Sequence, residues 1–328
     1  MDHPQWLNQI IEDPIDPHLP IIDPHHHLWD YPTSRYLAQE LLADTGSGHT
    51  VVQTVFVECL SMYRPNGPAA LRPIGETEFV HAIGDACKGP TRIAAGIVGF
   101  ADLTLGADVV PVLQAHIEAG GGRFKGIRHA ASWDASNAVG NAHTHPPAGL
   151  LLDSTFRKGF ACLDHFGLSF DAWIYHPQIK ELIDLAEAFP NTPIVLDHVG
   201  TPLGIGPYAG QRDKVLRQWR RDISQLAACG NVFVKLGGLA MKLNGFGWHK
   251  RLLPPTSLEL AAAMTPYIHH CIACFGVQRC MFESNFPVDK PSCAYTVLWN
   301  AFKRMTEKFS DQERAALFHD TAAKMYRI

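Results

Sequence analysis

The amino-acid sequence predicts an α/β fold, a distorted TIM-type (β/α)8 barrel of parallel strands that forms a single domain. Three observations lead to this prediction. Eight short apolar runs rich in β-branched residues recur, segments of helical periodicity separate several of them, and the length of 328 residues suits one barrel. A doubly wound open sheet is the alternative, but no G-x-G-x-x-G motif follows an early strand.

The expected strands are short and nearly continuously apolar, which is typical of a parallel sheet buried on both faces. Eight such strands are also the number that closes into a barrel. In chain order they are expected at residues 20–23, 51–58, 92–100, 124–128, 168–175, 193–197, 232–236 and 279–283.

Helical segments follow several of these strands. Residues 176–190 place their apolar side chains on one face and end at a proline. Residues 211–230 show the same periodicity and close with a glycine. Ser310 and Glu313 have the spacing of a capping box before the final apolar run, so a helix is expected to begin there.

We expect residues 1–328 to form one domain that begins with an N-terminal extension over residues 1–19. Two connections are long for loops, residues 131–150 and residues 240–256. The first is polar, rich in Gly and Pro, and without periodicity. Long irregular connections on a compact scaffold often cover an active site, so both are predicted to be active-site loops. A plain surface loop is the alternative.

Composition excludes several functional classes. The 28 basic and 32 acidic residues nearly balance, so neither a nucleic-acid surface nor a membrane anchor is expected. The first residues lack the apolar core of a secretory signal, and the sequence has no run of about 18 apolar residues. The eight cysteines lie mostly in apolar segments, and the single CxxC pair, Cys271 and Cys274, is expected to be reduced and structural. Zinc binding and redox chemistry are the alternatives for this pair, and a cytoplasmic location is expected.

Polar side chains gather where the expected strands end. Barrel active sites lie at the C-terminal ends of the strands, and desolvated polar groups there would be costly for stability alone. We therefore expect a functional site at this end of the barrel. In chain order the candidates are Asp23, His25, His27, Glu58, Arg128, His129, Tyr175, His176, Asp197, His198, Lys235, Glu283 and Asn285.

The first strand ends in three consecutive histidines. Residues two apart face the same side of a strand, so His25 and His27 share a face while His26 points away. His25 and His27 could therefore bind one cation through neutral ring nitrogens. The alternative is that they are only polar residues where the chain leaves the strand.

The last strand carries a second polar pair. Glu283 and Asn285 share a face and lie about 6–7 Å apart along the strand. An inward Lys235 on the neighbouring strand would form a compensated charge pair with Glu283. This pair either only neutralises a buried layer or contains a group with a shifted pKa that moves a proton.

The set of strand-end motifs resembles the amidohydrolase superfamily. The branch is that of predicted metal-dependent hydrolases, which includes L-fuconolactonase and pyrone dicarboxylate lactonase. The similarity extends from about residue 21 to residue 328, and the order of the motifs is specific although each alone is weak. The matching segments are "IIDPHHHLWD", "FKGIRH", "TPIVLDHVGTP", "NVFVKLGGL" and "CMFESNFPVD".

The resemblance implies roles for several positions. His25 and His27 match a pair of histidines that bind metal in many members. His198 matches a histidine that binds metal or polarises the substrate carbonyl, and His176 stands where a further ligand often lies. Asn285 stands where the family pattern has an aspartate that acts as general base.

This asparagine is the main departure from the pattern. A neutral amide cannot act as a general base, is a weak metal ligand, and removes one negative charge. We therefore expect one divalent metal, zinc first among them, to bind weakly at His25 and His27 or to be absent. Glu283 is then the first candidate to activate water, and His198 is the second candidate, as base or electrophile.

Substrate contacts are expected from Arg128, which suits a carboxylate or a developing oxyanion as a planar donor. Trp29 and Tyr175 are expected as apolar walls, with plain packing as the alternative. The substrate-binding candidates are Arg128, His176, Glu58, Trp29 and Tyr175, and the catalytic candidates are Glu283, His198, Asn285 and Lys235.

The expected function is that of a hydrolase that opens a carboxylated lactone, derived from a sugar acid or from aromatic catabolism, by water attack at the mouth of the barrel. A lactone is a better electrophile than an amide, so a site with little metal can suffice. The alternatives are a metal-dependent decarboxylase or amide hydrolase of the same superfamily, and a barrel that binds a small acid without turnover. The expected partner is a small carboxylate or lactone; nucleic acid and membrane are not expected, and a homodimer is left open.

Overall fold

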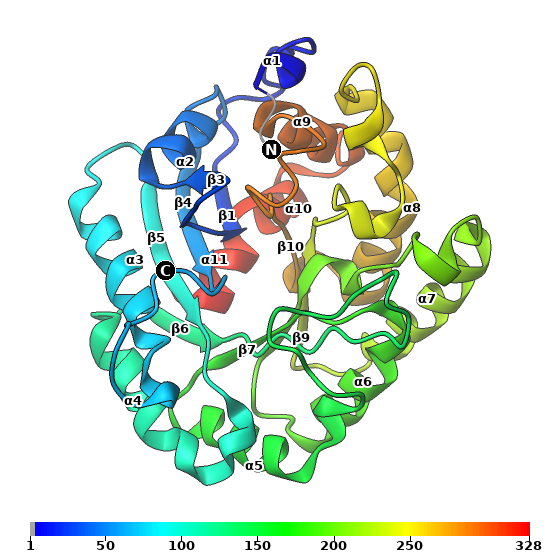
Figure 1. Cartoon of the computed structure of the whole chain (residues 1–328). Coiled ribbons are helices and arrows are strands. Elements are labelled where there is room, and N and C mark those ends of the chain that lie inside the picture. The colour runs from blue at the N-terminus through cyan, green and yellow to red at the C-terminus, as the bar shows by residue number, and fades with distance from the viewer. Residues whose placement is uncertain (1–3) are drawn as a thin grey trace.

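The computed structural model describes residues 4–328, which form a barrel of eight parallel strands ringed by helices (Figure 1). The strands lie side by side in the order in which they occur in the chain. They are β1 (Ile21–His26), β4 (Val51–Val57), β5 (Arg92–Gly99), β6 (Phe124–Ile127), β7 (Ser169–Ala172), β8 (Ile194–Leu196), β9 (Val232–Leu236) and β10 (Cys280–Phe282). An antiparallel hairpin of β2 (Trp29–Tyr31) and β3 (Ser34–Tyr36) follows the first strand.

Helices form the outer layer of the barrel, and the last helix lies at its centre in Figure 1, against the first and last strands. The helix that begins at Asp311 has the predicted capping box, in which Glu313 N donates to Ser310 Oγ. The helices are α1 (Pro4–Leu7), α2 (Ala38–Thr45), α3 (Ile74–Ala86), α4 (Val110–Ala119), α5 (Ser154–His165), α6 (Ile179–Ala188), α7 (Arg212–Leu226), α8 (Ser257–Phe275), α9 (Tyr295–Met305), α10 (Asp311–Ala315) and α11 (Thr321–Tyr326).

The predicted barrel is confirmed, and each of the eight expected strands is present with ends displaced by three residues at most. The largest shortening is in β7, which stops at Ala172. Beyond this point the carbonyl of Trp173 accepts hydrogen bonds from Ala131 N and Ser132 Oγ, both at 3.0 Å, in the chain that follows β6. Tyr175 therefore does not lie on the strand. The β2–β3 hairpin was not predicted.

The barrel closes between β1 and the chain that follows β10. Asn285 N donates to the carbonyl of His25 (3.0 Å). The fully buried carboxylate of Asp23 accepts from Ser284 N (3.0 Å) and from the hydroxyl of Tyr295 (2.9 Å). The first strand is thus tied to the last by a side chain as well as by backbone hydrogen bonds.

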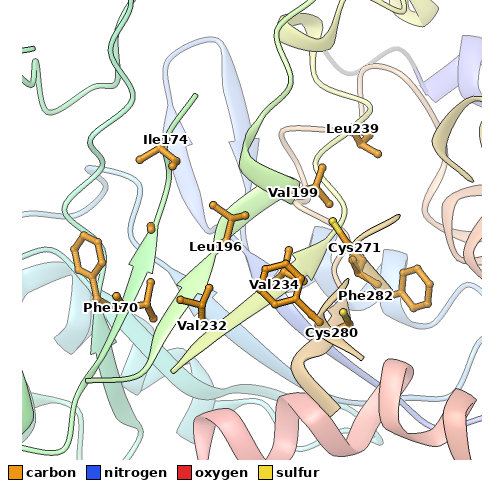
Figure 2. Close-up of a cluster of buried hydrophobic side chains, with 14 of the residues drawn as sticks. Phe170, Ile174, Leu196, Val199, Val232, Val234, Leu239, Cys271, Cys280 and Phe282 are labelled. Atoms are coloured by element: carbon orange, nitrogen blue, oxygen red, sulfur yellow. The ribbon is translucent and has the colours of Figure 1, made fainter. Parts of the chain in front are cut away.

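Two apolar cores hold the strands from opposite faces. The outer core lies between strands and helices, and Figure 2 shows part of it, where Val234 and Phe282 pack with Cys271 of α8. The inner core fills the floor of the barrel and includes Met325 and Tyr326 of α11. Each fully buried Val, Leu or Phe side chain contributes roughly 1.5–3 kcal/mol to folding, so the strand ends rest on a rigid base.

All eight cysteines are free thiols, and Cys271 of the CxxC pair is buried in the outer core. Within residues 4–328, no helix combines the length and the apolar character that crossing a membrane requires.

Candidate active site

A pocket of about 220 Å³ opens at the C-terminal ends of the strands, where (β/α)8 barrels carry their active sites. The chain after seven of the eight barrel strands contributes to its lining, and the two long loops contribute His143 and Met241. Twelve described residues line the pocket: His27, Trp29, Tyr31, Cys59, Leu60, Arg128, His143, Trp173, His198, Met241, Asn285 and Val288.

Tight turns carry two of these lining residues. His198 follows β8 and Asn285 follows β10, and both have a φ of 55°. This left-handed conformation costs a non-glycine residue roughly 1–2 kcal/mol. Residues that hold it are fixed by their surroundings, and such strain clusters at functional sites.

A histidine–carboxylate pair forms one wall of the pocket. His198 Nδ1 lies 2.7 Å from Glu283 Oε1, and the backbone N–H of His198 donates to the same oxygen at 3.1 Å. Burial opposes ionisation of Glu283, but the imidazoles of His198 and His25 lower its pKa to about 2. Because an ionised carboxylate only accepts hydrogen bonds, Nδ1 of His198 carries a proton, and in the neutral form of the ring Nε2 bears the lone pair.

Two glycines of the "VKLGGL" segment make room for this pair. A Cβ on Gly237 would lie 2.4 Å from Glu283 Cγ, and a Cβ on Gly238 would lie 2.4 Å from His198 Cγ. Gly238 also has a φ of +64°, which side chains rarely adopt. The segment therefore needs glycine at both positions to hold the histidine–carboxylate pair.

His25 lies behind the pocket and is fully buried. Its Nδ1 is 3.0 Å from Glu283 Oε2 and 3.1 Å from Lys235 Nζ, and its Nε2 is 3.4 Å from Arg128 Nη1. Burial and the neighbouring Lys235 ammonium lower the pKa of His25. The ring is therefore neutral at ordinary pH and connects the polar groups on either side of it.

Lys235 anchors the deepest polar layer of the barrel. Its Nζ lies 2.6 Å from Asp171 Oδ2 and 3.1 Å from Asp197 Oδ1, and the hydroxyl of Tyr326 donates to Asp171 Oδ2 at 2.7 Å. Burial alone would lower the pKa of Lys235, but the neighbouring carboxylates, Asp171 first, raise it. Lys235 is therefore a permanent buried cation that two aspartates compensate.

A second glutamate holds Arg128 at the opposite wall. Arg128 Nε donates to Glu58 Oε1 at 2.7 Å, and His143 Nε2 lies 3.0 Å from Glu58 Oε2. Burial would raise the pKa of Glu58, but Arg128 and His143 lower it to about 2. The guanidinium is thus fixed in place, and it lies 5.4 Å from the ring centroid of Trp173.

The structure sorts the predicted site residues into three groups. Those that line the pocket are His27, Trp29, Arg128, His198 and Asn285. Those that lie fully buried behind the lining are His25, Glu58, Lys235 and Glu283. Those that lie away from it are Tyr175 and His176.

Tyr175 and His176 lie apart from the pocket because the chain has already left β7. The Tyr175 hydroxyl donates to the carbonyl of Gly140 at 3.2 Å, and its ring packs in a small cluster with Leu203. His176 Nδ1 accepts from Leu203 N at 3.2 Å. The strand expected over residues 168–175 ends at Ala172, so Tyr175 does not lie on it.

Several residues of the site escaped the sequence prediction, and four of them contact its charged groups. Asp171 and Trp173 are two apart, and an acid inside an apolar strand was the signal that could have identified them. His143 lies in an irregular loop that has no register. Tyr326 is 155 residues from its partner Asp171, and the sequence around either residue does not predict their contact.

Three residues could hold a cation: His25, His198 and Glu283 offer ligand atoms that lie within 4.8 Å of one another. Two nitrogens and a carboxylate oxygen are donors that zinc accepts. However, the ring nitrogens of His25 face Lys235 at 3.1 Å and Arg128 at 3.4 Å. Asp171 and Asp197 balance the charge of Lys235, and Glu58 balances that of Arg128. The donors for a cation are therefore present beside two cations that are already compensated.

His25 and His27, the predicted metal-binding pair, have different hydrogen-bond partners. His27 Nδ1 lies 2.8 Å from the carbonyl of Val57 and therefore donates its proton there. Its ring lies 5.0 Å from that of His25, measured between centroids. Asn285, at the expected aspartate position, donates through Nδ2 to Asp289 Oδ1 at 3.1 Å, while its buried Oδ1 has no hydrogen-bond partner.

Comparison with known proteins gives one family. A family model described as Amidohydrolase matches residues 22–328. The protein y4mH of Sinorhizobium fredii, itself uncharacterized, is 33% identical over 331 residues, which cover 94% of this chain and 98% of that protein. An L-fucono-1,5-lactonase of Burkholderia multivorans is 26% identical over 322 residues, which cover 94% of this chain and 96% of that protein.

A solved structure supports the fold assignment. An amidohydrolase from Burkholderia multivorans with bound zinc aligns with a TM-score of 0.74 at 23% identity, covering 94% of this chain and 99% of that chain. At this identity the likeness shows a shared barrel and nothing further about the site.

Proposed function

The chain belongs to the amidohydrolase family, and we propose that it hydrolyses the ester bond of a lactone with His198 as the general base. The observation that carries the proposal is the position of His198, which lines the pocket, in front of Glu283, which is fully buried. The relative named L-fucono-1,5-lactonase, at 26% identity, supports a lactone as the substrate.

The two members of this pair have different tasks. The pKa of Glu283 is about 2, so its carboxylate has too little affinity for a proton to activate water by itself. It instead holds the Nδ1 proton of His198 and leaves Nε2 of the ring free to accept a proton. The order expected from the sequence, with Glu283 first and His198 second, is therefore reversed in this proposal.

Arg128 supplies the positive charge that the reaction needs. Its guanidinium lines the pocket, is held by Glu58, and cannot lose its proton. A fixed donor aimed at developing negative charge needs no reorganisation during the reaction. The unpartnered Oδ1 of Asn285 is a buried acceptor that can hold a proton of the attacking water.

The proposed reaction has two steps. The oxygen of a pocket water attacks the lactone carbonyl carbon while one water proton passes to Nε2 of His198, and Arg128 stabilises the resulting oxyanion. The carbonyl then re-forms, the ring C–O bond breaks, and His198 returns the proton to the departing alkoxide. The product is an open hydroxy acid, and the base is regenerated.

No step in this sequence uses a metal ion. A metal bound by His25, His198 and Glu283 would supply Lewis-acid chemistry, but Asn285 stands where the family pattern has a further carboxylate. We therefore expect lactone turnover to persist after dialysis against a chelator. Activity that is lost to the chelator and restored by stoichiometric metal would favour the decarboxylase or another metal-dependent reaction of the family.

The first prediction concerns the histidine–carboxylate pair. His198→Asn should lower kcat on a hydrolysed lactone by roughly 10²–10⁴-fold, the range typical of a lost general base. Glu283→Gln should lower kcat less, because His198 remains, and should leave KM nearly unchanged. Steady-state kinetics on purified variants measures both effects.

Circular dichroism and the melting temperature establish that both variants are folded. A His198→Asn variant that keeps wild-type kcat would refute the assignment of the base. A larger loss of kcat in Glu283→Gln than in His198→Asn would indicate that Glu283 is the general base.

A further inference from the structure

The outer half of the pocket differs in chemistry from its floor. We propose that the part of the substrate outside the lactone ester is planar and apolar, such as an aromatic ring fused to the lactone, and not a hydroxyl-rich sugar ring. This inference rests on the proposed lactone hydrolysis and specifies its substrate class. Three independent observations on the pocket walls support it.

The first observation is a row of stacked rings along one wall. The rings of His27 and Trp29 are 5.9 Å apart between centroids and 17° from parallel, and those of Trp29 and Tyr31 are 5.5 Å apart and 26° from parallel. Trp29 Nε1 donates to Ser34 Oγ, and the Tyr31 hydroxyl donates to the carbonyl of Cys59. The polar atoms of Trp29 and Tyr31 are thus engaged, and an aligned set of rings is a platform for a planar group.

The second observation is an exposed apolar rim. The side chains of Tyr31, Leu60 and Val288 line the pocket yet remain 37%, 40% and 38% exposed. Leu60 also has a φ of 62°, a conformation that costs a non-glycine residue roughly 1–2 kcal/mol. Glycine would relieve this cost, so Leu60 places an apolar side chain at the rim of the pocket at the expense of its backbone.

The third observation is that side-chain acceptors are few, and that Asn285 Oδ1 and His198 Nε2 are used by the attacking water in the proposed reaction. None of the twelve described residues that line the pocket is Asp, Glu, Gln, Ser or Thr. The glutamates Glu58 and Glu283 lie behind the wall, and Arg128 and His198 already engage them. A buried hydroxyl without a partner costs roughly 1–3 kcal/mol, so a ring with several hydroxyls would bind poorly here.

The test compares two six-membered lactones that both release an alcohol. Isochroman-3-one is fused to a benzene ring, whereas glucono-δ-lactone carries hydroxyls. We expect kcat/KM, corrected for spontaneous hydrolysis, to be at least tenfold higher for isochroman-3-one. Equal or faster turnover of glucono-δ-lactone would overturn the inference while leaving lactone hydrolysis intact.

A pair of matched variants links the preference to the rim. Leu60→Gly removes the rim side chain and relieves the backbone, so the melting temperature should hold or rise while KM for isochroman-3-one rises about tenfold, or 1.4 kcal/mol of binding. Met62→Gly is the control, because Met62 has a φ of 55° and is 38% exposed but does not line the pocket. An unchanged KM in Leu60→Gly, or an equal rise in both variants, would count against the inference.

Failure of the proposed reaction gives a different result. If neither lactone is hydrolysed, the lactonase proposal falls, and calorimetric Kd values for the same two compounds still decide the pocket chemistry. Tighter binding of isochroman-3-one supports an apolar pocket, and equal or tighter binding of glucono-δ-lactone overturns it.

Discussion

The two walls of the pocket have the same construction and different chemistry. On one wall a buried glutamate, Glu58, holds Arg128; on the other a buried glutamate, Glu283, holds His198. Burial opposes ionisation of both carboxylates, and in each case the partner lowers the pKa to about 2. Because arginine keeps its proton and histidine can exchange one, the same support gives a fixed charge on one side and a proton acceptor on the other.

The largest effect on stability and activity is expected when Arg128 is replaced by an uncharged residue. Arg128→Met leaves Glu58 buried without its main partner, so unfolding free energy should fall by about 3–5 kcal/mol and activity should be lost. The double variant Glu58→Gln/Arg128→Met should recover much of the stability but none of the activity. Chemical denaturation and lactone kinetics separate the two effects, and recovery of activity in the double variant would contradict the role of Arg128.

The same wall should respond to acid. The pKa of Glu58 is about 2 in the folded protein, below its ordinary value of 4.5, so its ionised form stabilises the fold above pH 4.5. This contribution, roughly 3 kcal/mol for a shift of this size, should be lost as the pH falls from 4.5 towards 2. Unfolding free energy measured across this window should fall more steeply in the wild type than in Glu58→Gln. If the unfolding free energies of the wild type and of Glu58→Gln fell equally with pH, the lowered pKa of Glu58 would be excluded.

The His198 wall can be disturbed without changing any of its polar groups. Gly238→Ala would place a methyl group 2.4 Å from His198 Cγ at a φ of +64°, so we expect a loss of about 1–3 kcal/mol in stability and displacement of the base. Gly230→Ala is the control, because a Cβ there meets no atom within 4 Å. Lactone kinetics should show a loss of kcat in the first variant alone, and equal kinetics would show that the wall tolerates the methyl group.

The smallest effect on stability and activity is expected from a substitution of Tyr326, which lies deep in the barrel. Tyr326→Phe removes one hydrogen bond to Asp171 and leaves the ring in the inner core, so stability should fall by about 1 kcal/mol. Melting temperature and kcat are the measurements. A fall in kcat greater than tenfold would show that the deepest layer also controls the chemistry at the mouth.

The two walls also differ in how far the sequence predicts them. Strand alternation and the apolar runs predict all eight strands and bring His198 and Glu283 to one end of the barrel. Tyr175 lies away from the pocket because β7 ends at Ala172, three residues before it. His143 was not predicted because it reaches Glu58 from a loop with no periodic register.

The sequence also left open which member of the histidine–carboxylate pair faces the pocket. Periodicity shows which side of a strand a residue occupies, but it does not show how deep the residue lies or which neighbour covers it. Gly237 and Gly238 set that depth, and their effect is visible only when the neighbouring strand end is in place.

The buried carboxylate of Asp23 has a consequence for the order of folding. Its oxygens are satisfied by Ser284, 261 residues later, and by Tyr295, 272 residues later. Until Ser284 and Tyr295 are in place, removing water from β1 would leave the carboxyl group of Asp23 buried without a hydrogen-bond partner. β1 must therefore stay in contact with water until then. Drying of the first strand and docking of the last therefore occur as one cooperative event, and half-barrel intermediates are disfavoured.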